Sequence, residues 1–261
     1  MRSILTLAQI VWMNMMRKKD VYVLLILLAV VLVMLVSLDV FGLGGASAYI
    51  KDVGLLFTWF FGWIIAGIAS TREIPGEEQG RTVFTILSKP VSRMQYVAGK
   101  WLGTWLVASV SVAVFYLLVI GVTLLKGGTV SALTLIQAIY MHVLLLGVIC
   151  ALGIALSTRQ NHDAAATLTF VITAVSFLVV PRVPEFMAKE EGFRAGILMF
   201  VYNIFPHFEV FDLRRRVVHG YGPIDAQPMA MISLYGAALV AILLFAAWLS
   251  YRNKMFVRGQ M

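Results

Sequence analysis

The sequence predicts an all-α integral membrane protein with six transmembrane helices. Of its 261 residues, 61% are hydrophobic and 13% are charged, whereas a soluble domain has about 45–50% apolar and about 25% charged residues. Six segments without Asp, Glu, Lys or Arg are long enough to cross about 30 Å of hydrocarbon as helices. They cover residues 21–38, 53–70, 101–125, 132–156, 164–180 and 229–250. Their continuous apolar character, without strand-like alternation, favours helices over a β-barrel.

The distribution of charge predicts the orientation in the membrane. The chain has 21 Lys and Arg against 13 Asp and Glu, a formal net charge of +8. If both termini are cytoplasmic, 13 basic residues lie inside and 8 outside, in agreement with the positive-inside rule. The run Arg214-Arg215-Arg216 falls on the outer side and opposes this assignment. We therefore predict a multi-pass protein of a bacterial cytoplasmic (inner) membrane, whose basic excess faces the anionic inner leaflet rather than a nucleic acid.

The N-terminal residues 1–20 predict an interfacial helix ahead of the first span. Leu7 and Val11 belong to a set of apolar residues at helical spacing, and polar residues occupy the other side. The basic run Arg17-Lys18-Lys19 follows directly. Such a helix is expected to lie along the inner membrane surface. A short soluble helix packed on a partner is the alternative.

The connection of residues 71–100 is expected to be cytoplasmic and to contain a short helix. Residues 77–88 can form about three turns, with Glu77 and Glu78 in the first turn, where the helix dipole favours negative charge. Lys89-Pro90 would end the helix, because a residue before proline avoids the helical region. A short amphipathic helix held between two spans suits the transmission of force from a partner. A plain solvated connector is the alternative.

The loop of residues 181–228 is expected on the outer side. Its apolar stretch 195–208 is too short to span the bilayer and is interrupted by Asn203 and Pro206, which predicts a re-entrant or interfacial helix. The loop is a candidate surface for a periplasmic protein. A candidate polar site on the outer side consists of His142, Asn203 and His207.

The sequence holds no signature of catalysis or of a bound cofactor. Gly99-Lys100 is followed by Trp101, so the Gly-Lys-Ser/Thr end of a nucleotide phosphate-binding loop is absent. Thirteen methionines, four histidines and one cysteine could offer ligands to a soft metal ion. However, His142 and Cys150 would lie about 12 Å apart along one helix axis, too far to share an ion. We predict no catalytic residue and no metal site in this chain.

The architecture and one long motif resemble the permease subunit of ABC type-2 transporters. The resemblance is most specific after the second span, where Glu73, Glu77, Gly80 and Arg81-Thr82 precede the stretch LSKPVSR of residues 87–93. It continues through Tyr96 and Gly99-Lys100 and extends, as pattern more than identity, over nearly the whole chain. Within this family, the sequence is most similar to the branch of multi-copper-enzyme maturation permeases.

The resemblance implies that residues 71–100 carry a coupling helix that docks into a groove on a separate ATPase subunit. It implies two ATPase copies, which bind ATP and Mg, and a permease homodimer or pseudo-dimer with a related permease. The implied coupling residues are Glu73, Glu77, Glu78, Arg81, Thr82, Phe84, Leu87, Lys89, Pro90 and Arg93. A second cytoplasmic contact would involve Arg159, Asn161 and Asp163. Glu77 and Glu78 are expected to face basic groups on the ATPase.

We therefore interpret residues 1–261 as a single ABC type-2 transmembrane domain, the permease of an ATP-driven exporter that is not itself an enzyme. A non-transporting scaffold is the main alternative. It would anchor an ATPase and present its outer loop to a periplasmic maturation partner. An ATP-independent channel or carrier is a third possibility. The substrate is not encoded, because an apolar permease lumen carries no readable motif.

Overall fold

A computed structural model describes residues 2–17, 20–39, 46–80, 91–189, 192–252 and 254. This described part is α-helical and contains no strand, which confirms the all-α fold class. The α-helices are α1 (Arg2–Arg17), α2 (Asp20–Asp39), α3 (Ala46–Gln79), α5 (Arg93–Leu125), α6 (Ala132–Ser157), α7 (His162–Leu178), α8 (Val183–Met187), α9 (Phe193–Ile204), α10 (Arg214–His219) and α11 (Ala226–Arg252). Two short 3-10 helices are η1 (Val180–Arg182) and η2 (Phe208–Phe211).

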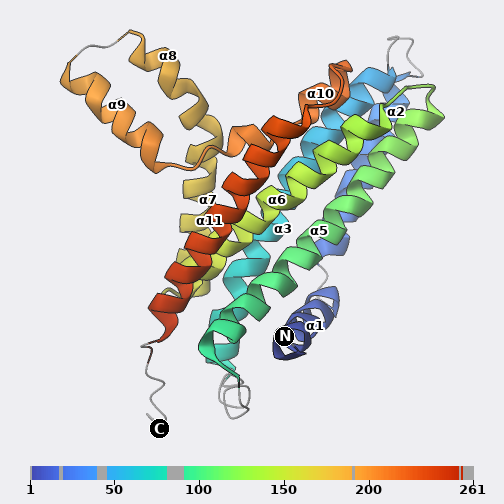
Figure 1. The fold of residues 1–261 in the computed structure, drawn as a ribbon. Coiled ribbons are helices and arrows are strands. Elements are labelled where there is room, and N and C mark those ends of the chain that lie inside the picture. Colours follow the sequence, from blue (N-terminus) through green and yellow to red (C-terminus); the bar gives the residue numbers. More distant parts are fainter. Residues whose placement is uncertain are drawn as a thin grey trace.

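The long helices form one elongated bundle. In Figure 1, α3, α5, α6 and α11 run side by side, and their mutual packing builds the core. The end of α3, the start of α5, the end of α11 and helix α1 all lie at one end of the bundle, which we call the α1 end. Helices α8, α9 and α10 lie at the opposite end, which we call the α10 end. This arrangement agrees with the alternating sides predicted from the sequence.

Five helical segments of the described chain are long and apolar enough to cross a membrane: Ser47–Gln79, Arg93–Leu125, Ala132–Ser157, His162–Met187 and Ala226–Arg252. The remaining predicted span, 21–38, coincides with α2, whose apolar stretch Val21–Ser37 is shorter. Most of these helices are longer than the charge-free segments of the sequence, because helical structure continues through charged residues at both ends of the bundle, as at Lys51 in α3 and Arg93 in α5.

The predicted helix boundary near Glu77 is wrong. Helix α3 runs without a break to Gln79, with Pro75 inside it, so Glu77 and Glu78 lie in its last turn and not in the first turn of a new helix. Negative charge at a helix C-terminus is unfavourable by itself, but both carboxylates here form ion pairs with lysines of this chain. Residues 81–90 of the predicted coupling helix, including Arg81, Thr82, Phe84, Leu87, Lys89 and Pro90, lie outside the described residues.

Small residues let the core helices approach closely within the chain. A Cβ added to Gly62 of α3 would lie 2.6 Å from Val112 Cγ2 of α5, and one added to Gly147 of α6 would lie 3.2 Å from Trp105 Nε1. Cys150 of α6 is fully buried. Gly62 and Gly147 therefore allow close packing between helices inside the chain.

Helix α1 packs on α5 rather than standing alone on a surface. Its buried face includes Leu7 and Val11. A Cβ added to Gly99 would lie 2.7 Å from Leu7 Cβ, and one added to Gly103 would lie 2.5 Å from Val11 Cβ. Glycine at these two positions thus forms the groove that seats α1. The sequence predicted the helix, and the structure supplies its partner surface.

The chain continues helically beyond the predicted end of the fifth span. Pro181 and Pro184 occupy the first turns of η1 and α8, where proline needs no backbone N–H. The helical segment that begins at His162 therefore continues to Met187. The outer loop, predicted to start at residue 181, starts after this segment. Helix α9 confirms that a helix forms within the predicted stretch 195–208, and none of its residues is buried. Figure 1 shows α8 and α9 projecting away from the bundle.

Candidate functional site

A buried charged triad joins the end of α3 to the start of α5. The side chain of Lys100 is 1% exposed, and its Nζ donates to Glu73 Oε2 over 2.9 Å and to Glu77 Oε1. Glu77 Oε2 also accepts a hydrogen bond of 2.6 Å from the Tyr96 hydroxyl. Glu73 and Glu77 are one helical turn apart on α3, as Tyr96 and Lys100 are on α5, so each pair projects from one face. The lysine balances carboxylate charge that could not otherwise be buried.

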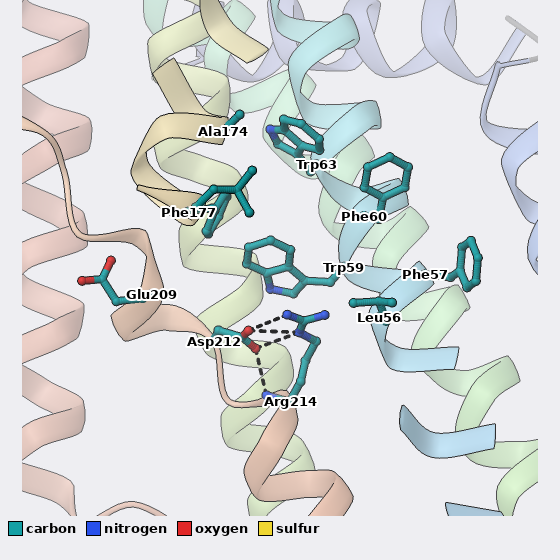
Figure 2. A pocket seen from close by; sticks show the side chains of 11 residues that line it. Leu56, Phe57, Trp59, Phe60, Trp63, Ala174, Phe177, Glu209, Asp212 and Arg214 are labelled. Carbon is teal, nitrogen blue, oxygen red and sulfur yellow. Dashed lines mark hydrogen bonds and ion pairs between the residues drawn. The ribbon is translucent and has the colours of Figure 1, made fainter. Parts of the chain in front are cut away.

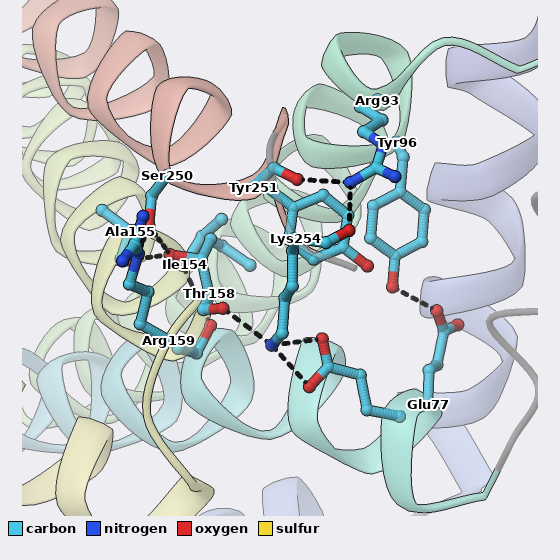
Figure 3. Close-up of polar contacts among 12 residues, drawn as sticks. Glu77, Arg93, Tyr96, Ile154, Ala155, Thr158, Arg159, Ser250, Tyr251 and Lys254 are labelled. Carbon is cyan, nitrogen blue, oxygen red and sulfur yellow. Dashed lines mark hydrogen bonds and ion pairs between the residues drawn. The ribbon is translucent and has the colours of Figure 1, made fainter. Parts of the chain in front are cut away.

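A second ion pair ties the same end of α3 to the C-terminal segment. Lys254 Nζ donates to both carboxylate oxygens of Glu78 over 2.7 and 2.8 Å, and to the Thr158 carbonyl over 2.9 Å. Thr158 directly follows α6. The ammonium group of Lys254, which follows α11, therefore connects the C-terminal part of the chain to α3 and to the α6–α7 turn (Figure 3).

Arg93, the first residue of α5, holds the end of α11. Its Nη1 donates to the carbonyls of Tyr251 over 2.6 Å and Lys254 over 2.8 Å, which satisfies acceptors that a helix end leaves open. The rings of Tyr96 and Tyr251 stack with centroids 5.4 Å apart, as Figure 3 shows beside Arg93. A capping box between Ser92 and Gln95 fixes where α5 begins.

These residues form one connected set at the α1 end. We call it the charged cluster, and it consists of Glu73, Glu77, Glu78, Arg93, Tyr96, Lys100 and Lys254. All its members except Lys254 stand just before or just after residues 81–90 in the sequence. The two ends of that connection are therefore anchored on each other, on α11 and on the α6–α7 turn.

The predicted second contact lies at the same end of the bundle. Arg159 Nε donates to Ser250 Oγ of α11 over 2.8 Å. Asn161 caps α7 by accepting from the Ala164 backbone N–H over 3.1 Å. Asp163, in the first turn of α7, has a side chain that is 94% exposed. The structure thus gives Arg159 and Asn161 structural partners and leaves the Asp163 carboxylate accessible.

The carboxylates of Glu77 and Glu78, which are expected to face basic groups on the ATPase, meet Lys100 and Lys254 of the same chain. Their contact with an ATPase stays a prediction. Sequence reasoning missed Lys100, although the spacing Glu73–Glu77 and Tyr96–Lys100 was a usable signal. Lys254 had no local signal, because it lies 176 residues from Glu78.

The structure does not assemble the predicted outer polar site. His142 is 1% exposed in the core, and its ring lies 5.9 Å from those of Trp59 and Tyr116. Asn203 Nδ2 donates to the Met199 carbonyl of its own helix over 2.8 Å. His207 Nδ1 lies 3.2 Å from Glu209 Oε1. Each residue has its own neighbours, because α9 projects from the bundle while α6 lies in its centre.

An aromatic cavity lies near the α10 end, between α3, α7 and η2. It has a volume of about 490 Å³ and walls that include Trp59, Trp63 and Phe177. Arg214 closes one side, with Nη2 2.6 Å from Asp212 Oδ2 and the guanidinium carbon 4.8 Å from the Trp59 ring centre. Figure 2 shows the guanidinium lying against this ring. The cavity suits an apolar group with a polar end, and the hydropathy pattern gave no sign of it.

The described residues include no group of three or more His, Cys, Asp or Glu placed to hold a metal ion. No candidate set of metal ligands is therefore found among them, and the absence of a metal site in the whole chain stays a prediction.

A family model described as ABC-2 family transporter protein matches residues 5–254. The matched region begins inside α1 and ends at Lys254, so it contains the whole charged cluster. No curated protein matches the chain.

Proposed function

We propose that this chain, which belongs to the ABC-2 transporter family, is the permease of an ATP-driven exporter and couples to a separate ATPase subunit. Membership of the family supports a multi-pass membrane permease. The observation that carries the coupling proposal is the charged cluster, which anchors both ends of residues 81–90. A connection that only joined two spans would need no buried Lys100 between two glutamates, because a buried ion pair is a weak source of stability.

The proposed coupling follows the paths of the two long helices. A force on residues 81–90 reaches α3 through Glu73, Glu77 and Glu78, and reaches α5 through Arg93 and Lys100. Helix α3 has 34 residues and α5 has 33, so each extends about 50 Å at 1.5 Å per residue. A tilt imposed at the α1 end is therefore transmitted to the α10 end, where α3 carries Trp59 of the aromatic cavity.

The partners in this proposal are two ATPase copies that supply ATP and Mg, and a second permease, identical or related, that completes the path. Asp163 would add a contact to the ATPase from the same end. The α1 end is placed in the cytoplasm of a bacterial inner membrane, with both termini inside. Assignment to the multi-copper-enzyme maturation branch is a finer proposal that rests on the resemblance of the sequence alone.

The decisive experiment measures ATPase stimulation by the permease. The chain is reconstituted in nanodiscs with its cognate ATPase subunit, and Leu87→Asp is compared with Leu125→Ser. Leu125 is 87% exposed at the opposite end of α5 and serves as the matched control. We expect Leu87→Asp to abolish stimulation with normal membrane insertion, while Leu125→Ser retains it. Unchanged stimulation in Leu87→Asp would overturn the coupling assignment.

One observation favours a second candidate, the scaffold. Helix α9 projects from the bundle (Figure 1) and exposes Phe193 by 84% and Phe200 by 66%, a surface on which another protein could dock. Substrate flux into reconstituted vesicles separates the candidates, with an ATPase-dead subunit as control. ATP-dependent flux supports the exporter, and ATPase binding without flux of any tested substrate supports the scaffold.

A further inference from the structure

The three consecutive arginines at the α10 end have different environments. Arg214 is paired with Asp212. Arg215 is exposed. Arg216 lines a separate cavity of about 350 Å³. The run that opposed the orientation rule in the sequence therefore contains one residue with a local charge partner, one on the surface and one that lines a cavity.

This second cavity lies where α10, the start of α3 and the start of α6 meet. Its polar lining side chains are basic or hydroxylic, Val217 and Val218 complete the wall, and none of the lining side chains is acidic. Those that carry donors are Lys51, Thr129, Ser131, Thr134, Arg216 and His219. Positive charge without a lining carboxylate is an arrangement that favours an anion.

Lys51 and Arg216 have donors to spare. Lys51 Nζ donates to the Thr129 carbonyl over 3.3 Å and to the Val218 carbonyl over 3.5 Å, which uses two of its three N–H groups. Arg216 Nη1 donates to the Gly222 carbonyl over 3.4 Å, and a guanidinium has five N–H groups. These contacts hold both cations at the cavity wall by backbone oxygens, which do not neutralise their charge.

A buried hydroxyl provides an independent indication of a ligand. Thr134 is only 2% exposed, and within the described structure its Oγ1 has no hydrogen-bond partner. A buried hydroxyl without a hydrogen-bond partner is unfavourable. Thr134 stands in the first turn of α6, and the N-cap residue Ser131 makes no side-chain cap. The open N–H groups of this turn add the positive end of the α6 dipole.

We propose that this cavity binds an oxyanion of phosphate type, held by Arg216, Lys51, the Thr134 hydroxyl and the first turn of α6. The volume equals that of about twelve waters in the liquid, so it holds a phosphate group together with part of an attached ester. The same chemistry is offered by free phosphate and by the phosphate of a lipid headgroup. The bound anion joins α3, α6 and α10, and this site does not depend on coupling to an ATPase.

The test for free anion uses the full chain in neutral detergent. Its thermal unfolding midpoint is followed while inorganic phosphate replaces chloride at constant ionic strength. We expect a saturable rise in the midpoint for the wild type. Arg216→Gln and the nearly isosteric Thr134→Val should weaken the apparent phosphate affinity about tenfold or more. Arg215→Gln removes the same charge from the neighbouring exposed residue and should leave the phosphate response unchanged.

The lipid source is tested by native mass spectrometry with added phosphatidic acid. If inorganic phosphate gives no response but phosphatidic acid adducts form and are lost in Arg216→Gln and Thr134→Val, the occupant is a lipid phosphate. Arg215→Gln must then retain the adducts. The proposal is overturned if neither probe binds the wild type, or if Arg215→Gln weakens binding as much as Arg216→Gln. Thr134→Val decides the question alone if Arg216→Gln does not fold.

Discussion

Lys100 of α5 donates to Glu73 of α3 over 2.9 Å, and the two side chains are 1% and 5% exposed. Glu77 also contacts Lys100. These contacts lie at the end of α3 and the start of α5, the two helices that residues 81–90 connect. A buried charge of this kind is stable only with its partner, so the pair obliges the ends of α3 and α5 to stay together.

Lys100→Met should destabilise the protein strongly. It removes the ammonium that Glu73 and Glu77 share, and loss of one partner of a buried ion pair costs about 3–5 kcal/mol. Thermal unfolding in detergent, compared with the exposed-site control Lys189→Met, measures the effect. Adding Glu73→Gln and Glu77→Gln to Lys100→Met should recover part of the loss. A variant as stable as the control would show that the lysine is not buried as described.

Breaking the Glu78–Lys254 pair should affect coupling more than stability. The two side chains are 24% and 29% exposed, and a solvent-accessible ion pair contributes about 1 kcal/mol or less. We expect Glu78→Gln and Lys254→Met each to reduce ATPase stimulation severalfold with little change in the unfolding midpoint. The double variant should be no worse than either single variant, because both remove one link. Multiplicative losses would contradict a shared role.

Gly103→Val should detach α1 from α5. A Cβ at this position would lie 2.5 Å from Val11 Cβ, whereas nothing lies within 4 Å of one added at Gly121 of the same helix. Overpacking of this kind costs about 1–3 kcal/mol. Limited proteolysis near the N-terminus should be faster in Gly103→Val than in Gly121→Val. Equal cleavage rates would mean that α1 is not seated on this groove.

Arg214→Lys should weaken the α10 end although it keeps the charge. The guanidinium contacts both oxygens of Asp212 and lies on the Trp59 ring, and an ammonium cannot reproduce that planar fork. We expect a loss of about 1.5–3 kcal/mol, measured by thermal unfolding. Arg215→Lys, at the neighbouring exposed residue, should leave the thermal unfolding midpoint unchanged. Identical behaviour of the two variants would argue against the bidentate contact.

Much of the local structure was predictable because lipid leaves few options for a polypeptide backbone. Continuous apolar runs must satisfy their hydrogen bonds internally, so they form helices wherever they span. The same reasoning placed α6 and α11 to within a few residues. It failed at Glu77 and Pro181, where charged residues and prolines looked like boundaries. Ion pairs with distant lysines, and prolines placed in first turns, let both helical segments continue.

The sequence by itself therefore determined the fold class, the approximate spans, the amphipathic first helix and the motif that indicates the family. These features depend on residues that are neighbours along the chain. Only the tertiary structure decided that Lys100 meets Glu73, 27 residues away, and that Lys254 meets Glu78, 176 residues away. Which charges become partners depends on how the helices pack, and helical periodicity shows which side chains share a face but not which helix that face meets.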